Sequence, residues 1–287
     1  MLQTITCMAV QKGHAQHKSR SLAVAGRKLN ALQRGFSLVE IALVLVIAGL
    51  ALGAGISLLG SQLENKKVSD TQNRIKEASE AIIAFAMVNG RLPCPAAPPA
   101  TVTAVNRGLS APLNPPIGTC TNFDGFVPAR TLGLSEQGVN GNSEGITQDA
   151  WSFGLRYRVS NYFDTPGNYY PLTKADGMKG NPSFIPLIDT LKICSSATGI
   201  ALPDCGTATK LASAAFVVWS TGNNGGAGSG ADEAKNLDTD VLYVFHERRA
   251  ATGSGGEFDD ILQWRTIGSI DVAQIAALTE KDRKAHV

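Results

Sequence analysis

Residues 36–60 form an apolar run in which Glu40 is the only charged side chain. At about 1.5 Å of rise per residue, a helix over this run measures roughly 37 Å, which is enough to cross the hydrocarbon core of a bilayer. An ionisable side chain in such a segment is unfavourable unless it has a partner, and intramembrane acids therefore point to function. The run predicts a membrane-spanning helix that carries one carboxylate with a specific role.

Basic residues are concentrated before this run. Residues 1–35 contain six Lys or Arg and no Asp or Glu, so they form a basic leader. Of the 26 basic residues in the chain, 20 remain after the leader, against 24 acidic residues, which gives the remainder a net charge of −4. The positive-inside rule places the leader in the cytoplasm and the rest of the chain outside it. The overall charge of +2 therefore reflects the leader and does not indicate a nucleic-acid-binding surface.

The start of the run has a recognisable order of residues. Gly35, Phe36 and Ser37 follow the basic leader, and Glu40 comes after two apolar residues. This order closely resembles the cleavage signal of type IV pilins and type II secretion pseudopilins. The resemblance implies that a prepilin peptidase cuts between Gly35 and Phe36 on the cytoplasmic side. It also implies that Phe36 becomes an N-methylated terminus and that Glu40 is retained in the mature chain.

Cleavage gives a chemical reason for Glu40. A new α-ammonium group at Phe36 and the Glu40 carboxylate are each unfavourable alone in a low dielectric, but they can pair between stacked subunits. Two other interpretations stay open, in which Glu40 is protonated or pairs with the start of its own helix. An ordinary secretory signal is a further alternative, since small residues occur at 51–55. A carboxylate early in the apolar core would impair such a signal.

The helical pattern continues past the apolar run. Residues 61–89 lack proline and carry apolar residues at steps of three to four, with charges between them. Gly90 and Pro93 then favour a helix end. We predict one helix over residues 36–89, with a transmembrane first half and an amphipathic second half. The amphipathic half would carry a globular head formed by residues 90–287.

The head contains strand-like runs. β-Branched and aromatic residues at 154–160, 214–220 and 240–246 predict three strands, because turn residues bound each run. Short helices are expected at 185–194 and 270–278, and the Pro- and Gly-rich stretch before the first strand is expected to be irregular. With the long N-terminal helix, these elements predict an α+β fold in which an antiparallel sheet packs on the helix.

Four cysteines follow the long helix: Cys94, Cys120, Cys194 and Cys205. An even number of cysteines in an exported, loop-rich domain favours two disulfides, although free buried thiols are an alternative. Of the three connectivities, we prefer Cys94–Cys120 with Cys194–Cys205, because each pair closes one local loop. A zinc site is not indicated, since the chain has no Cys-x-x-Cys pair and only two histidines after the leader.

Four short motifs in the head extend the resemblance: RLPCP, DAWSFGLRY, STGNNG and FDDILQW. In the pilin family a Gly follows the Trp of the second motif, and an Asp precedes the last Gly of the third. This chain has Ser152 and Asn224 at those positions. These departures, with the size of the chain, favour a minor pilin or an atypical pseudopilin over an abundant major subunit.

The resemblance also implies a calcium site, since major pseudopilins bind calcium in a loop near their last strands. Asp232, Glu233, Asp238 and Asp240 cluster in the matching region, and calcium takes oxygen ligands. We predict Asp232, Asp238 and Asp240 as the candidate ligands, the alternative being that these acids are only solvated. A Gly-x-Ser-x-Gly match at 141–145 lacks the strand and helix of a nucleophile elbow, so no catalytic residue is expected.

The chain is therefore expected to be a non-enzymatic subunit of a type II secretion pseudopilus or a type IV pilus. It would sit in the bacterial inner membrane with its N-terminus cytoplasmic and its head periplasmic before it enters a filament. The expected partners are other pilin or pseudopilin subunits, the prepilin peptidase and an inner-membrane assembly platform. Nucleic acid is not expected as a partner, and calcium is the only cofactor considered. The alternatives are a pilin-anchored adhesin or ligand-binding head, and an exported enzyme with an ordinary signal.

Overall fold

A computed structural model describes residues 36–98, 103, 105–136, 145–180, 190–226, 230–249 and 256–270, without the side chains of 51–59 and 179–180. The leader with Gly35, the Gly-x-Ser-x-Gly serine and the predicted helix beyond Ile270 lie outside the described residues. The chain divides into two compact units, Met1–Gly55 and Ile56–Val287.

The described elements follow one another in this order: α1 Leu38–Asn89, β1 Asp124–Phe126, α2 Ala129–Leu132, β2 Arg156–Val159, α3 Gly177–Gly180, β3 Leu191–Cys194, β4 Lys210–Ala214, β5 Phe216–Ser220, α4 Ala231–Leu237, β6 Leu242–Val244, β7 Ile261–Arg265 and the 3₁₀ turn η4 Ile267–Ser269.

Helix α1 begins two residues after the predicted start and ends at the predicted residue. Ser37 precedes it and caps it, because the Ser37 hydroxyl accepts the backbone N–H of Glu40 at 3.2 Å. Gly90 ends the helix in the left-handed region (φ 62°), and its N–H donates to the Ala86 carbonyl at 2.8 Å. These two caps explain why the predicted bounds are close to the observed ones.

In the first unit, the described apolar side chains of α1 from Leu38 to Leu50 are exposed, with exposed fractions of 90% and 72% at these two residues. Among the residues described, we find no helix whose length and apolarity would suffice to span a membrane.

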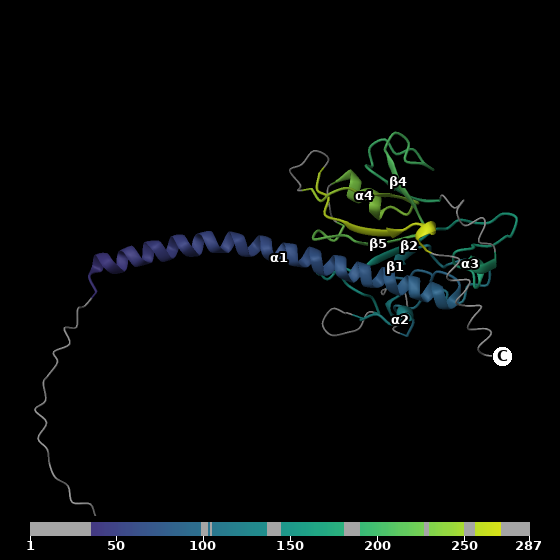
Figure 1. Cartoon of the computed structure of the whole chain (residues 1–287), viewed down its shortest axis with the longest axis horizontal. Helices are drawn as coiled ribbons and strands as arrows, with labels where there is room; N and C mark the ends of the chain where they lie inside the picture. The colour runs from purple at the N-terminus through teal and green to yellow at the C-terminus, as the bar shows by residue number, and fades with distance from the viewer. Residues whose placement is uncertain are drawn as a thin grey trace, which may run out of the picture. The chain divides into compact units, whose positions relative to one another are not determined.

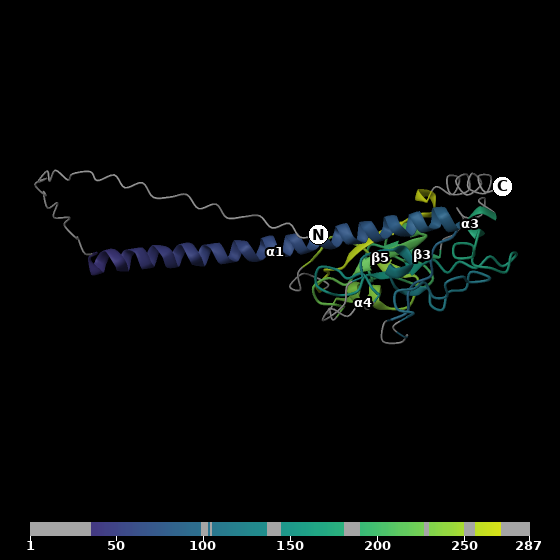
Figure 2. The same cartoon turned by 90° about the horizontal axis from the view of Figure 1, so that it is seen from below.

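The second unit is an α+β body with two sheets, so the predicted fold class is confirmed at this level. The four-stranded sheet has the order β1-β2-β5-β7, and all its neighbours are antiparallel. The second half of α1 packs on one face of this sheet (Figures 1 and 2). A three-stranded sheet of order β4-β3-β6 covers the other face.

Helix α1 packs on the sheet through residues at steps of three and four: Ile75, Ala78, Ile82 and Ala86, all buried. They share one core with Tyr157 of β2, among other strand residues. The small alanines allow the helix to approach the sheet closely, and the isoleucines add apolar area to the core that they share with Tyr157.

Polar contacts also join α1 to the turn before β2 and to β7. Arg74 donates to the carbonyl oxygens of Gln148 and Asp149 at 2.7 and 2.9 Å. The Thr71 hydroxyl accepts the N–H of Ala150 at 3.1 Å, and Ser79 donates to Gln263 of β7 at 3.3 Å. The amphipathic half of α1 is therefore held by directional bonds as well as by apolar burial.

The second sheet departs from the prediction. The expected strand at 240–246 is β6, but it lies parallel to β3 in the smaller sheet and not in the sheet that contacts α1. The short helix expected at 185–194 is wrong over Leu191–Cys194, which form β3. β3 pairs with β4 on one side and with β6 on the other, and this tertiary pairing outweighs the weak local preference of four residues.

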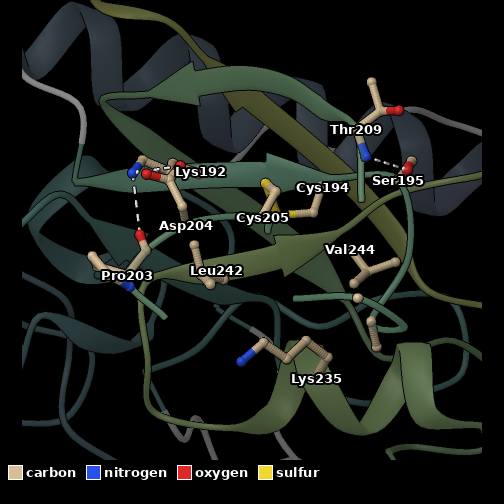
Figure 3. The surroundings of a disulfide bond; sticks show 12 residues. Lys192, Cys194, Ser195, Pro203, Asp204, Cys205, Thr209, Lys235, Leu242 and Val244 are labelled. Atoms are coloured by element: carbon tan, nitrogen blue, oxygen red, sulfur yellow. Dashed lines mark hydrogen bonds and ion pairs between the residues drawn. A yellow bond between two sulfur atoms is a disulfide. The ribbon is translucent and has the colours of Figure 1, made fainter. Parts of the chain in front are cut away.

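Both preferred disulfides are present. Cys94 and Cys120 have a Cα–Cα distance of 5.4 Å, and Cys194 and Cys205 have one of 5.6 Å. The second bond fastens the loop after β3 beside Leu242 of β6, as Figure 3 shows. Each disulfide joins cysteines that are close in sequence and so closes a local loop. This agrees with a body in which long irregular segments flank short strands.

Candidate functional site

The DAWSFG motif forms a tight turn closed by a buried acid, Asp149. One oxygen of its carboxylate accepts the N–H groups of Trp151 and Phe153 at 2.9 and 2.8 Å, and the other accepts the Ser220 hydroxyl at 2.6 Å. Burial raises the pKa of Asp149, while these hydrogen bonds and the nearby Arg74 oppose the rise. Ser152 has a φ of 72°, in the left-handed region that favours glycine.

The STGNNG motif lies against the FDDILQW motif. The Asp259 carboxylate accepts the N–H groups of Asn223 and Asn224 at 2.7 and 3.3 Å. Gly222 has a φ of 64°, and a Cβ at this residue would lie 2.2 Å from the Asp259 Oδ1 atom. Ser220 already joins STGNNG to the DAWSFG turn, so the three motifs meet at one place in the fold.

Three buried carboxylates gather there: Glu233 of α4, and Asp259 and Asp260 just before β7. Their exposed fractions are 1%, 4% and 4%, and one oxygen from each lies within 4.8 Å of the others. Among the described residues, these three acids lie close enough together to offer one ligand atom each to a metal ion. We call this set the carboxylate cluster.

Hydrogen bonds hold each member of the carboxylate cluster in place. Glu233 accepts the N–H of Asp259 at 2.8 Å through one oxygen and the Asn224 amide at 3.0 Å through the other. Asp260 accepts the Asn236 amide N–H at 2.8 Å, and Asn236 also donates to the Val244 carbonyl at 3.1 Å and accepts the Val244 N–H at 2.7 Å in β6. The cluster thereby connects α4, β6 and the start of β7.

The proximity of the three acids changes their proton affinities. Burial, together with the neighbouring charges of Glu233 and Asp259, raises the pKa of Asp260 to about 7, against the opposing effect of the Asn236 amide. Burial also raises the pKa of Glu233, against hydrogen bonds from Asp259 and Asn224. Like charges at this distance disfavour full ionisation unless a cation balances them.

The cluster fits a hard divalent cation. Carboxylate oxygens are the ligands that calcium and magnesium prefer, and three acids in one place provide the charge. The Asp259 Oδ1 atom is buried and has no hydrogen-bond partner in the described part of the chain. A buried carboxylate oxygen without a donor is unfavourable, and a cation in the cluster would satisfy it.

The predicted calcium ligands do not come together. Asp232 is held by the Ala197 N–H at 2.7 Å, by His246 at 3.0 Å and by Arg249 at 3.2 Å. Burial alone would raise the pKa of Asp232, but these hydrogen bonds outweigh it and leave the pKa below its usual value. Arg249 already gives Asp232 a cationic partner in place of a metal ion.

The other two predicted ligands, Asp238 and Asp240, hold the ammonium group of Lys235. The Lys235 Nζ atom donates to Asp238 at 2.7 Å and also contacts Asp240. Burial alone would lower the pKa of Lys235, but the hydrogen bonds to the carboxylates of Asp238 and Asp240 outweigh this effect. The pKa of Lys235 therefore lies above its usual value. The structure therefore shifts the candidate metal site from this set to the carboxylate cluster.

Of the predicted processing and assembly residues, Phe36 and Glu40 are described. The Phe36 side chain is exposed to 77%, and Glu40 lies in the first turn of α1 with its side chain exposed. Phe36 and Glu40 belong to the first unit, and the carboxylate cluster belongs to the second.

Sequence reasoning missed Asp259 and Asp260 as metal-site residues. Both lie in FDDILQW, and Glu233 lies beside Asp232, so each belonged to a segment already singled out. The available signal was the pair of adjacent acids directly before an apolar strand, where a carboxylate is rarely buried without a reason. Spacing along the chain favoured the nearer acids, whereas the fold brings together acids that are 26 residues apart.

Family models, curated proteins and solved structures were compared with this chain, and none of them matches it.

Proposed function

We propose that the chain is a non-enzymatic structural subunit of the pilin type, used in a type II secretion pseudopilus or a type IV pilus. The observation that carries the proposal is the order Gly35, Phe36 and Glu40 at the start of a 52-residue helix. A basic leader precedes this helix, and a disulfide-bonded α+β body packs on its second half.

In this proposal, residues 36–60 anchor the chain in the inner membrane, with the leader cytoplasmic and the head periplasmic. Prepilin peptidase removes the leader, and the α-ammonium of Phe36 in one subunit pairs with Glu40 of a neighbour. The pairing satisfies two charges that are unfavourable alone in lipid, and it fixes the axial register of the subunits. The partners are thus other pilin-like helices, the peptidase and an assembly platform.

The first prediction concerns Glu40. Glu40→Ala should insert in the membrane normally but be lost from sheared filaments, because the Phe36 ammonium then has no partner. Glu80→Ala is the matched control, since Glu80 lies on the exposed face of the same helix, with a side chain 60% exposed. Blotting of sheared and membrane fractions measures the difference, and equal incorporation of both variants would contradict the register role.

Mass spectrometry of the mature chain tests the processing step. We expect it to begin at N-methylated Phe36. A mature terminus beyond Gly53 would instead support an ordinary secretory signal and would remove the basis of the filament proposal.

We also propose that the head binds one calcium ion in the carboxylate cluster. Calcium would offset two of the three negative charges of Glu233, Asp259 and Asp260, and would contact the Asp259 oxygen that lacks a donor. The ion would join α4 to the start of β7 and stabilise the head by mass action. A subunit whose head folds outside the cytoplasm would then gain this stability when it binds calcium there.

The second prediction tests this site. Asp259→Asn should weaken calcium binding by at least about tenfold, as loss of one charged ligand does. Asp238→Asn should leave affinity within about twofold, because Asp238 contacts Lys235 outside the cluster. Titration calorimetry of the full chain in detergent measures both, and the reverse ranking would restore the originally predicted ligands.

A second candidate function, a pilin-anchored adhesin, is favoured by one observation. Phe123, Phe163 and Tyr170 form a chain of ring contacts with centroid distances of 4.8 and 4.9 Å, and Phe163 is 39% exposed. Exposed aromatic groups are frequent in binding surfaces. This candidate would add a ligand to the proposed subunit and would not replace its role in a filament.

A further inference from the structure

The sequence contains three Asn–Gly pairs: Asn89–Gly90, Asn140–Gly141 and Asn224–Gly225. An asparagine before glycine is open to deamidation, because glycine has no side chain to shield its backbone nitrogen from the asparagine amide. The pair at 140–141 lies outside the described residues. The other two pairs are described, and their surroundings differ at the atoms that would react.

Asn224 and Gly225 lie in the turn between β5 and α4. The N–H groups on both sides of Gly225 are bonded, since Asn224 donates to Asp259 at 3.3 Å and Gly226 donates to the Oδ1 atom of Asn224 at 2.9 Å. Among the residues that the structure describes, no hydrogen-bond partner is found for the Gly225 N–H. The nitrogen that would attack the Asn224 amide is therefore not held by another group of this turn.

The side chain of Asn224 is held beside this nitrogen. Its bond to the Gly226 N–H spans Gly225, so the Asn224 Cγ atom and the Gly225 nitrogen belong to one small hydrogen-bonded ring. The same donor would stabilise the negative charge that develops on Oδ1 when Cγ is attacked. The Nδ2 atom, which would leave as ammonia, donates to the Glu233 Oε2 atom at 3.0 Å. Asn224 and Gly225 are both half-buried, so water reaches the turn.

The fold requires glycine at position 225. Gly225 has a φ of 63°, in the left-handed region, and a Cβ atom there would lie 2.3 Å from the Cζ atom of Phe153. The packing of the turn against Phe153 therefore imposes the reactive pair once asparagine stands at 224.

We propose that Asn224 undergoes spontaneous deamidation through a succinimide. The Gly225 nitrogen forms a bond to the Asn224 Cγ atom, the bond from Cγ to Nδ2 breaks, and the proton from the Gly225 nitrogen leaves with Nδ2 as ammonia. Water then adds to either carbonyl carbon of the succinimide and opens the ring. The products are aspartate and isoaspartate at 224, and the net reaction consumes water and releases ammonia. The proposal does not rest on the pilin-type function.

The Asn89–Gly90 pair is the internal control. The Gly90 nitrogen donates to the Ala86 carbonyl at 2.8 Å. The Asn89 Nδ2 atom donates to the Phe85 carbonyl at 2.9 Å, which turns this side chain back along α1. Both groups that would react are therefore occupied within the helix end. The two pairs have the same residue types, so a difference in their rates reports the fold.

Deamidation would change the surroundings of the carboxylate cluster. An aspartate at 224 would face Glu233 with an oxygen in place of the amide donor, so a hydrogen bond would be lost and a like charge added. The head should then be less stable without a cation. A bound divalent cation should offset this loss, and this last step alone rests on the proposed calcium site.

The test incubates the full chain in detergent for several days in heavy-oxygen water, at mildly alkaline pH, and digests it afterwards in ordinary water. The heavy oxygen marks deamidation that occurred before digestion. Mass spectrometry measures label at both pairs, and fragmentation distinguishes isoaspartate from aspartate. In the folded chain we expect Asn224 to react at least about tenfold faster than Asn89, with both products present. In concentrated urea the two rates should become similar, because neither pair is then held by the fold.

Asn224→Gln and Asn223→Gln form a matched pair of variants. Glutamine at 224 would have to close a larger ring, so label at this position should be lost. Asn223→Gln keeps the reacting pair and the backbone bond to Asp259, and should leave the rate at Asn224 unchanged. In a thermal unfolding curve, Asn224→Asp should have a lower midpoint than the natural chain with a chelator present, and calcium should narrow the gap.

Protection of Asn224 in the folded chain but not in urea would overturn the proposal, as would equal rates at Asn224 and Asn89 before unfolding. Aspartate without isoaspartate would also overturn it, because direct hydrolysis would then be the route. Deamidation at Asn224 without any effect of calcium on the gap would contradict the calcium site and support the deamidation. Circular dichroism of each variant establishes that it is folded.

Discussion

Two groups of acids lie close together in the head but have opposite surroundings. Asp232, Asp238 and Asp240 each contact a cation, whereas Glu233, Asp259 and Asp260 contact one another and neutral donors. Asp232 and Glu233 are neighbours in the first turn of α4, yet they belong to different groups. Successive helical residues point about 100° apart, so one acid reaches His246 and Arg249 and the other enters the cluster.

This difference separates acids that stabilise the fold from acids that are available for a ligand. An acid already paired with a cation gains little from a metal ion, because the metal would have to displace its partner. In the carboxylate cluster the acids repel one another instead of pairing with a cation, and a bound divalent cation would relieve this repulsion. The three variants below test this comparison, in order of expected effect.

The largest effect is expected for Asp260→Asn in calcium-free protein. A pKa of about 7 in place of 3.8 corresponds to about 4 kcal/mol of destabilisation above pH 7, as an upper estimate. The folded state binds this proton more tightly than the unfolded state, so stability should fall as pH rises from about 4 to about 7. Urea denaturation at several pH values should show that fall in the natural chain and not in Asp260→Asn. With saturating calcium, the natural chain should be the more stable of the two.

A smaller effect with the opposite dependence on pH is expected for Asp232→Ala. The variant removes hydrogen bonds to Ala197, His246 and Arg249, and should lower the free energy of unfolding by about 3 kcal/mol. Because the folded pKa of Asp232 is lowered, its contribution is present above about pH 4 and is lost as pH falls through the folded value. Denaturation at pH 7 and pH 3 should therefore show a larger difference at pH 7; the reverse would contradict the ion-pair assignment.

The smallest effect is expected for Lys235→Met. Lys235 joins Asp238 and Asp240 near the surface, where Asp238 is 39% exposed, and its removal should cost about 1 kcal/mol or less. Calcium affinity should not change, since the carboxylate cluster is separate. A thermal unfolding curve with and without calcium measures both quantities, and a gain of calcium affinity would show that the first group also binds metal.

The long helix and the disulfides could be predicted from the sequence because their signals are local. Ser37 and Gly90 cap α1, and the buried residues of its second half recur at steps of three to four. Each disulfide closes a short loop, of 26 and 11 residues, so the pairing by proximity was correct. Local signals of this kind do not depend on how distant segments meet.

The second sheet and the carboxylate cluster depend on distant segments. In β7, Ile261, Leu262 and Trp264 face both sides of the sheet, and since both sides are covered, the alternation that marks a strand is absent. β4 has exposed residues at its start and little apolar pattern. The acids of the cluster come from α4 and from the start of β7, and no spacing rule joins them before the fold is known.

The bonds from Arg74 and Thr71 to residues 148–150, and from Ser79 to β7, have a mechanical consequence. They occur at intervals along one stretch of α1 and lie beside the apolar contacts of Ile75 and Ile82. A force along the helix axis would load these contacts together in shear, so that they must break at once. A force across the axis would peel them apart in turn. A body attached in this way resists a force along α1 better than a force across it.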